Sequence, residues 1–212
     1  MITEQSLSAL RTSLASSMSE KRYRHTIEVE NMVIRLGELY APEKILILRA
    51  AALLHDITKE YSSDHHLMIF AQKGLSLTRE DLLAPKTFHA RTAAALIGES
   101  YPELAEDEVI SCVRWHTTGR RGMTICEKLL YLADYIDDSR TFSSCVLLRR
   151  YFFGAEPELM TKEERERHLR ATLLLSYEHT LKDLLSEGAP IDEDTIRARN
   201  ELLVEEAKAK NN

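Results

Sequence analysis

A chain of 212 residues with 44% hydrophobic residues is long enough to bury a substantial core and short enough to form one domain. Its formal net charge of −6 argues against a general nucleic-acid-binding protein, because phosphate contacts require a clustered Lys and Arg surface. Seven glycines and five prolines are few, and helix-favouring residues dominate, so the composition predicts an all-α fold.

Helical periodicity recurs along almost the whole chain, whereas the alternating pattern of strands does not. Pro42 stands where a first helical turn tolerates it, Gly74 and Gly188 follow helices as stop signals, and Thr161 with Glu164 forms a capping-box pattern. The least regular regions are expected at 74–88, 117–123 and 139–142. In chain order, the pattern predicts helices over residues 4–18, 22–40, 43–57, 63–73, 89–99, 103–115, 124–138, 143–153, 161–187 and 192–207.

The cysteines and the hydropathy pattern indicate a soluble, cytoplasmic protein without a membrane partner. No charged-then-apolar leader opens the chain, and no apolar run approaches the roughly 20 residues of a membrane span. Cys112, Cys126 and Cys145 are odd in number and lack a CxxC spacing, which predicts reduced and buried thiols.

Several histidines and carboxylates lie beside apolar helical segments, where each must be hydrogen-bonded, paired or bound to a metal. Taken singly, each is better explained by a structural role, such as a satisfied core histidine, a salt bridge or a helix cap. They are His25 in "RYRHT", His55 and Asp56 in "AALLHDITKE", His89 in "KTFHA", His116 in "RWHTTGR" and Asp134 in "LLYLADYIDD".

Taken together, these residues indicate a metal site. Imidazole nitrogens and carboxylate oxygens form a ligand set suited to iron, manganese, zinc or cobalt. On a helix, His55 and Asp56 would differ by about 100° in direction, so they can bind different sides of one ion, or Asp56 can lie between two ions. Lys59, four residues after His55, returns to the same face and places a cation beside the metal, which suits phosphate chemistry.

Other titratable residues are expected to lie outside the site. The charged run "TKEERERHLR" (161–170) is most simply a solvated helix face, and the histidine within it is expected to be solvated. Asp137 and Asp138 are expected as partners of Asp134 or as surface residues. The four histidines set aside as non-ligands are His65 and His66, expected on an exposed helix start, together with His168 and His179.

The order His…His-Asp…His…His…Asp over a helical chain resembles the HD-domain metal-dependent phosphohydrolases. At finer grain, "RYRHT", "ALLHDITK", "FHA", "RWHTTGR", "EKLLYLADYI" with Arg140 after it, and "PIDEDTIRARN" resemble one branch of that family. That branch is the bacterial symmetrical bis(5'-nucleosyl)-tetraphosphatases, and the match runs from about residue 20 to 204. The activity implied is metal-dependent hydrolysis of diadenosine tetraphosphate into two ADP.

The resemblance implies a role for each matching position. The metal ligands would be His25, His55, Asp56 and Asp134, holding iron, with manganese, cobalt and zinc as alternatives. His89 and His116 would hold a second ion or hydrogen-bond the substrate phosphate, and the catalytic set would be Asp56, Lys59, His89 and His116. Substrate would be bound by Lys59, His89, His116, Thr117 and Arg140, and by the stretch Pro190, Ile191, Asp192, Glu193, Asp194 and Thr195 that borders the nucleoside.

The expected architecture is an HD-domain helical bundle with a C-terminal helical extension. An N-terminal helix over 1–19 would precede the HD phosphohydrolase domain over 20–204, which carries an insertion near 150–172, and a tail over 205–212 would follow. The partner would be a small-molecule dinucleoside polyphosphate, with a homodimer left open. Two alternatives keep the fold: an HD enzyme acting on a deoxynucleoside phosphate or a guanosine alarmone, and a non-catalytic metal-binding regulatory module.

Overall fold

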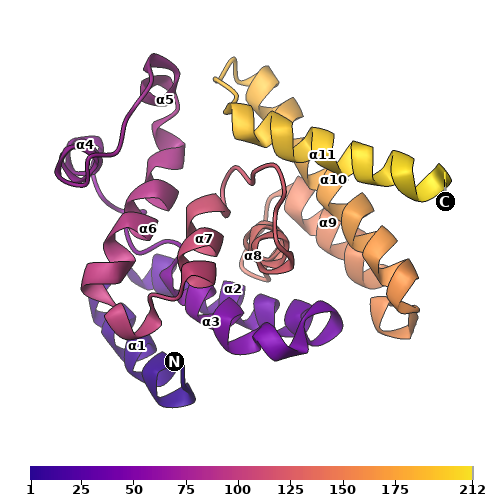
Figure 1. The fold of residues 1–212 in the computed structure, drawn as a ribbon, viewed down its shortest axis with the longest axis horizontal. Coiled ribbons are helices and arrows are strands. Elements are labelled where there is room, and N and C mark those ends of the chain that lie inside the picture. The colour runs from indigo at the N-terminus through magenta and orange to yellow at the C-terminus, as the bar shows by residue number, and fades with distance from the viewer. Residues whose placement is uncertain (212) are drawn as a thin grey trace.

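The computed structural model describes residues 1–211, which fold into helices joined by short connections (Figure 1). No β-strand occurs within residues 1–211, so the predicted all-α class is confirmed. Four short 3₁₀ helices, each beginning with proline, lie between α-helices: η1 (Pro42–Lys44), η2 (Pro85–Thr87), η3 (Pro102–Leu104) and η4 (Pro157–Leu159). The α-helices are α1 (Glu4–Ser17), α2 (Glu20–Tyr40), α3 (Ile45–Leu54), α4 (Ser63–Gln72), α5 (Arg79–Leu83), α6 (Phe88–Ser100), α7 (Asp107–Trp115), α8 (Ile125–Ile136), α9 (Ser143–Gly154), α10 (Lys162–Ser186) and α11 (Glu193–Asn211).

The helix start and stop signals predicted from the sequence are found at helix ends in the structure. Thr161 caps α10: its side chain accepts from the Glu164 backbone N–H at 3.3 Å, and the Thr161 N–H donates to the Glu164 carboxylate at 2.9 Å. Gly74 and Gly188 follow α4 and α10 with φ of 63° and 61°, the left-handed conformation in which glycine has no steric penalty.

The helix predicted over 43–57 is too long by a turn, and α3 ends at Leu54. The His55 ring nitrogen Nδ1 lies 2.6 Å from the Ala52 carbonyl oxygen, an acceptor that a continuing helix would need for its own backbone. The chain then makes tight turns, with the Lys59 N–H donating to the Asp56 carbonyl at 3.0 Å. A second difference is α5, a short helix with a Thr78–Asp81 capping box, in the region expected to be irregular.

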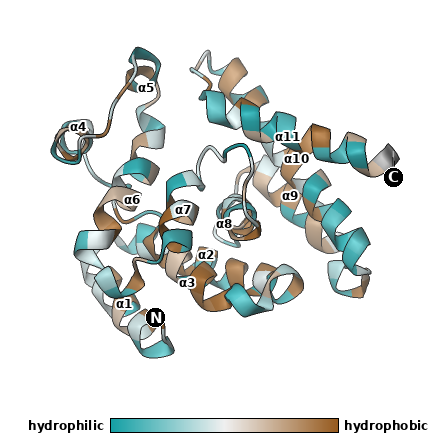
Figure 2. Ribbon diagram, viewed as in Figure 1, coloured by the Kyte–Doolittle hydropathy of each residue, from teal (hydrophilic) through white to brown (hydrophobic). Residues whose placement is uncertain are grey.

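The helices enclose one hydrophobic core, with α8 near its centre (Figure 1). The second half of α3 is entirely apolar, and every residue from Ala50 to Leu54 is fully buried. The N-terminal helix α1 joins this core through Leu7, Leu10 and Leu14, and α11 joins it through Ala198 and Leu202. Figure 2 shows hydrophobic residues gathered on α3 at the centre and hydrophilic residues on the outer faces of α10 and α11.

The first and the last described helices, α1 and α11, both pack on the core. Helix α11 continues to Asn211, so the backbone of the expected tail is helical as far as the structure describes it. The expected insertion near 150–172 comprises the end of α9, η4 and the start of α10. Among the described residues, no helix is both long and apolar enough to cross a membrane. Cys112, Cys126 and Cys145 are buried free thiols, as predicted.

Candidate metal centre

The candidate ligands meet where several helices end or begin. His55 and His116 stand directly after the last residues of α3 and α7, His25 lies near the start of α2, and His89 is the second residue of α6. Because α3 is a core helix, the residues that follow it enter the centre of the protein: His55 is fully buried and Asp56 is 3% exposed. The polar edge of the core predicted from "LLHD" is therefore an internal site.

Three of the histidines are oriented by the same backbone contact. His55, His89 and His116 each place Nδ1 within 2.6 to 2.9 Å of the carbonyl oxygen three residues earlier. A carbonyl can only accept a hydrogen bond, so Nδ1 carries the proton in each ring. The Nε2 atoms are then left with free lone pairs that face the site, which is how metal-binding histidines are commonly held.

Two histidines and two carboxylates lie close together between α2, α3 and α8, and three of them, His25, His55 and Asp134, could together hold an ion. His25 Nε2 lies 3.0 Å from Asp134 Oδ1 and 3.7 Å from Asp56 Oδ2, and His55 Nε2 lies 3.3 Å from Asp56 Oδ2 and 3.9 Å from Asp134 Oδ1. Two ligand atoms bound at about 2.1 Å are about 3.0 Å apart when they lie at right angles around an ion and about 4.2 Å apart when they lie opposite each other, so these spacings suit a shared ion.

The hydrogen bonding within this group supports the same conclusion. His25 Nε2, His55 Nε2 and Asp56 Oδ1 are buried polar atoms without a hydrogen-bond partner. Unpaired buried polar atoms are costly, and three of them in one cluster point to a group that completes the site. The residues present therefore fit a divalent metal ion.

A second group faces the other oxygen of Asp56. His89 Nε2 and His116 Nε2 lie 3.3 Å and 3.8 Å from Asp56 Oδ1, and the two imidazole nitrogens are 3.1 Å apart. The Thr117 hydroxyl lies 3.2 Å from both of these nitrogens. Asp56 thus stands between the two histidine pairs, and the structure brings the histidines predicted from the spacing into one continuous site.

Three cations surround the cluster. The Lys59 ammonium lies 3.0 Å from His89 Nε2, at the α6 side of the site. Arg140 donates to Asp134, through Nη2 to the carboxylate and through Nε to the backbone carbonyl at 2.8 Å. Arg22 donates to the Asp56 carboxylate, a contact that the sequence analysis missed although Arg22 lies three residues before His25 on the same helix face. The positive charges of these side chains offset the negative charges of the buried carboxylates. The same side chains lie where they could contact an anion bound at the cluster.

The pKa of each buried titratable group in the site depends on its burial and on the charges of its neighbours. Burial favours the neutral form of Asp56, but the imidazole of His55, followed by His89 and Lys59, holds the pKa of its carboxyl well below the usual range. Burial would lower the pKa of His25, yet the Asp134 and Asp137 carboxylates raise it to about 9. Burial, reinforced by His55, lowers the pKa of His116 to about 4.

The C-terminal stretch lies apart from the ligands. No described hydrogen bond or ion pair connects residues 190–195 to the metal cluster. The stretch instead begins α11, where the Asp192 side chain accepts from the Asp194 N–H at 2.8 Å. In the turn before the stretch, Glu187 forms an ion pair of 3.4 Å with Lys86 of η2. This ion pair places the α10–α11 turn beside η2, the short helix that directly precedes α6.

Two of the histidines set aside are not in the expected environments. His66 is buried at 6% exposure, with Nδ1 lying 2.9 Å from the Thr92 hydroxyl, because the α4 face it occupies packs towards α6. His168 is half-buried: it stacks on Phe152 and lies 2.9 Å from the Phe152 carbonyl, since this end of α10 packs on α9. His65 is exposed, as predicted. Asp137, expected at the surface or as a partner of Asp134, is buried beside His25 Nδ1 at 3.5 Å.

Comparison with known proteins yields a consistent result. The HD domain model matches residues 22–138. A protein named symmetrical bis(5'-nucleosyl)-tetraphosphatase from Halalkalibacterium halodurans is 29% identical over 191 residues, covering 89% of this chain and 92% of its own. A protein of the same name from Bacillus subtilis is 28% identical over 186 residues, covering 88% and 91%.

The structural comparison agrees with the sequence comparisons. A crystal structure of a predicted HD superfamily hydrolase involved in NAD metabolism from Clostridium acetobutylicum superimposes with a TM-score of 0.79 at 28% identity. The match covers 93% of this chain and 97% of the other. The matched region, 22–138, contains every histidine and carboxylate of the cluster. The family predicted from the motifs is thus confirmed, and the chain belongs to the HD domain family of metal-dependent hydrolases.

Proposed function

We propose that this protein is a metal-dependent hydrolase that cleaves diadenosine tetraphosphate symmetrically into two ADP. The observation that carries the proposal is the group of four ligands with unpartnered buried nitrogens, flanked by Lys59 and Arg140. The names of the relatives from Halalkalibacterium halodurans and Bacillus subtilis support this choice of substrate.

The ion is proposed to be iron, held by His25, His55, Asp56 and Asp134, with manganese, cobalt and zinc as the other metals that suit nitrogen and oxygen ligands. When bound, such an ion lowers the pKa of water and polarises a phosphoryl oxygen. The free thiols buried in the core support a cytoplasmic location, where cysteines stay reduced.

The residues around the ligands suit the charge of a polyphosphate. Lys59 is held beside His89 at 3.0 Å, and Thr117 offers a hydroxyl within 3.2 Å of the same nitrogen. Arg140 and Arg22 each donate to a metal-binding carboxylate and keep further donors for phosphate oxygens. Catalysis of phosphoryl transfer rests mainly on such positioning and charge stabilisation.

Symmetric cleavage requires that the substrate be held so that one of its two central phosphates, and no other, lies at the reacting position. Water adds to one of the two central phosphorus atoms, the bridging P–O bond breaks, and each half leaves as ADP. We propose that the stretch Pro190–Thr195 borders one nucleoside, because the turn before it is paired with Lys86 of η2, directly before the helix whose His89 would hold the phosphates with Lys59. The anchored nucleoside then fixes which phosphate reaches the cluster.

The test is to incubate iron-reconstituted protein with diadenosine tetraphosphate under reducing conditions and to separate the products by anion exchange. We expect ADP as the single nucleotide product. His55→Ala and Asp56→Ala should lose both bound metal and activity. His65→Ala removes an exposed histidine ten residues from His55 and should retain both, which makes it the matched control.

Two results would contradict the proposal. Release of ATP and AMP by the wild-type protein would exclude symmetric cleavage. Wild-type metal content together with full activity in His55→Ala would exclude the assigned ligands. Bound metal can be measured by elemental analysis independently of turnover, so the two assignments are tested separately.

A further inference from the structure

A cavity of about 620 Å³ opens beside the metal cluster, on the side away from Lys59 and His89. Its wall is formed by the first turns of α2 and by the segment 139–142 that connects α8 to α9. His25 and Arg140 belong both to this wall and to the metal site. A ligand in the cavity would therefore be continuous with one bound at the cluster.

The cavity carries an excess of positive charge. Its lining contains Lys21, Arg22, Arg24 and Arg140 but only one carboxylate, Glu20. Arg22 and Arg140 are engaged with the carboxylates of Asp56 and Asp134, whereas no described ion pair involves Lys21 or Arg24, which are both exposed at the rim. The free charge of these two side chains suits an anion with several negative oxygens.

An aromatic ring stands in the same wall. Phe142 is 68% exposed, one of the most exposed large hydrophobic side chains among the described residues. Phe142 is the N-cap residue of α9, directly before Ser143. Its side chain cannot cap the helix by a hydrogen bond, so the ring lies at the amino end of α9 without a capping role. An exposed aromatic face next to free cations suits a nucleoside phosphate, whose base can stack on the ring.

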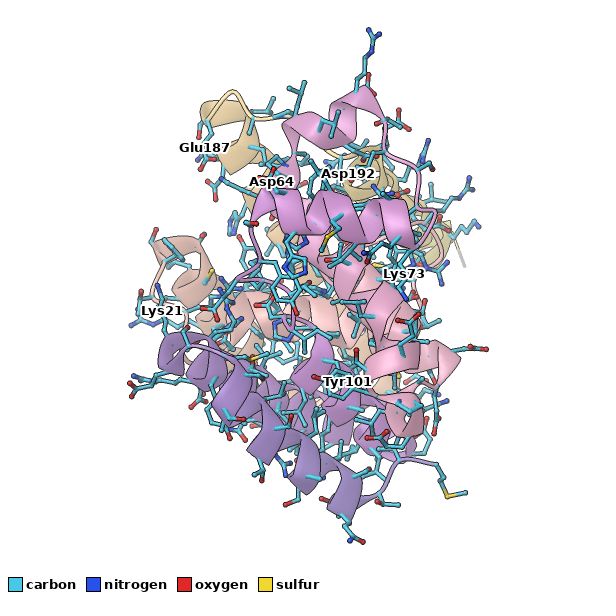
Figure 3. The ribbon with its side chains drawn as sticks, turned by 90° about the vertical axis from the view of Figure 1, so that its left-hand side faces the viewer. Lys21, Asp64, Lys73, Tyr101, Glu187 and Asp192 are labelled. Atoms are coloured by element: carbon cyan, nitrogen blue, oxygen red, sulfur yellow. The ribbon has the colours of Figure 1, made fainter. Side chains whose placement is uncertain are left out.

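The cavity lies at the opposite end of the site from the proposed nucleoside anchor. A continuous row of polar side chains connects the two ends of the site. Lys59 contacts His89, which lies 3.3 Å from the Asp56 carboxylate. Asp56 lies 3.7 Å from His25, and His25 and Arg140 both contact the carboxylate of Asp134. The α10–α11 turn is paired with Lys86 of η2, directly before α6, the helix that carries His89. In the side view, Lys21 and Glu187 lie apart on the same side of the molecule, with Glu187 above Lys21 (Figure 3).

We propose that this cavity is a second nucleoside-diphosphate subsite, which holds the half of the dinucleotide opposite to the half bordered by Pro190–Thr195. The inference rests on the proposed function, since a substrate with two identical halves needs a place for each on either side of the reacting phosphates. Phe142 stacks on the base, and Lys21 and Arg24 contact the phosphates from the rim. These residues position the substrate and take no part in bond breaking.

The kinetic test compares diadenosine tetraphosphate with adenosine tetraphosphate, which has the same phosphate chain but a single nucleoside. Loss of base stacking costs about 1 to 3 kcal/mol, so Phe142→Ala should lower kcat/KM for the dinucleotide about 10-fold. It should change the value for adenosine tetraphosphate less, because the single nucleoside of that compound can bind on the Pro190–Thr195 side instead. Phe142→Tyr should restore the ratio, because the aromatic face is kept. Tyr151→Ala removes an exposed aromatic residue of α9 outside the cavity and should leave the ratio unchanged.

A binding measurement tests the subsite without turnover. Calorimetric titration of the metal-loaded wild-type protein with ADP should give two sites per chain, one of which weakens in Phe142→Ala and in Arg24→Glu. Arg150→Glu makes the same charge change at an exposed arginine outside the cavity and should bind like the wild type.

The outcomes separate the subsite from the proposed function. A single ADP site that is unaffected by Phe142→Ala and Arg24→Glu would overturn the subsite, even if the wild type converts diadenosine tetraphosphate to ADP. Failure to hydrolyse the dinucleotide, together with loss of one ADP site in both variants, would overturn the proposed function and support the subsite.

Discussion

At the residue scale, a short polar network supports the loop that carries Lys59. The Thr92 hydroxyl lies 2.9 Å from His66 Nδ1 and 2.9 Å from the Thr58 hydroxyl, and Thr58 donates to the His89 carbonyl at 2.9 Å. Thr58, Thr92 and His66 are all buried. A buried network of this kind fixes the backbone of His89 and of the 55–60 turn relative to each other. His66 thus affects the site without facing it.

The protonation of His66 should be visible in the stability of the protein. Burial, reinforced by nearby His65 and Lys59, lowers the pKa of His66 below its usual 6.5. Between the lowered value and 6.5 the unfolded chain binds more protons, so the free energy of unfolding should fall as the pH decreases through this range. Urea unfolding at about pH 7, 6 and 5 should show this fall, with a smaller slope in His66→Gln.

The neighbouring histidine provides the control for this measurement. His65 is exposed and stacks on Tyr61 at a centroid distance of 4.2 Å, so His65→Gln should keep the wild-type slope. Equal slopes for His66→Gln and the wild type would show that the buried histidine has no part in the pH dependence.

At the scale of the elements, the connection between α7 and α8 is supported by α10. Gly119 adopts φ of 66° and donates its N–H to the Trp115 carbonyl at 2.8 Å, which turns the chain just after His116 and Thr117. A Cβ built at Gly119 would lie 1.9 Å from the Tyr177 hydroxyl oxygen. Glycine is therefore required twice here, for the left-handed backbone and for the close approach of α10.

Gly119→Ala should be strongly destabilising, by about 3 kcal/mol or more, because left-handed strain adds to a steric clash. Gly122→Ala tests the strain alone: its φ is 69°, but nothing lies within 4 Å of the added Cβ, so we expect a loss of about 1 kcal/mol. Tyr177→Phe removes the clashing hydroxyl and should recover part of the loss in a double variant. Thermal and urea unfolding would measure all three, and equal losses for the two glycine variants would exclude the clash.

At the scale of the whole molecule, the proposed ion would join helices that are distant in the sequence. His25 comes from α2, His55 and Asp56 follow α3, and Asp134 lies on α8, three helices that contact one another in the core. A ligand that binds only the folded state stabilises it by mass action, by about 2.7 kcal/mol at a concentration 100 times its Kd. Metal should therefore affect global unfolding as well as activity.

Removal of the metal should lower the Tm of the wild-type protein. Chelation followed by thermal unfolding should show this shift, and adding iron back under reducing conditions should reverse it. His55→Ala, which lacks a ligand, should unfold at a temperature that does not respond to chelator or iron, whereas His65→Ala should behave like the wild type. An unchanged Tm in a wild-type sample shown by elemental analysis to have lost its metal would argue against a site that bridges these helices.

Much of this protein can be read from the sequence because the relevant information is local. The 3.6-residue periodicity defined most helices, and Thr161 and Gly188 marked a start and a stop by chemistry within a few residues. The motif "LLHD" indicated a polar group at the edge of the core, because an apolar run cannot end inside a protein in a carboxylate unless that carboxylate is satisfied. The HD family was identified from the resemblance of these motifs to those of its members, and the match of the HD domain model to residues 22–138 confirmed it.

The tertiary structure decided what depends on contacts between distant segments. His66 is buried because α4 packs towards α6, a contact that no local pattern in the sequence indicates. The contact between Arg22 and Asp56 and the close approach of Tyr177 to Gly119 likewise join residues far apart in the chain. Local sequence sets the conformations that each segment favours, but burial and pairing are properties of the packed whole, so only the folded chain determines them.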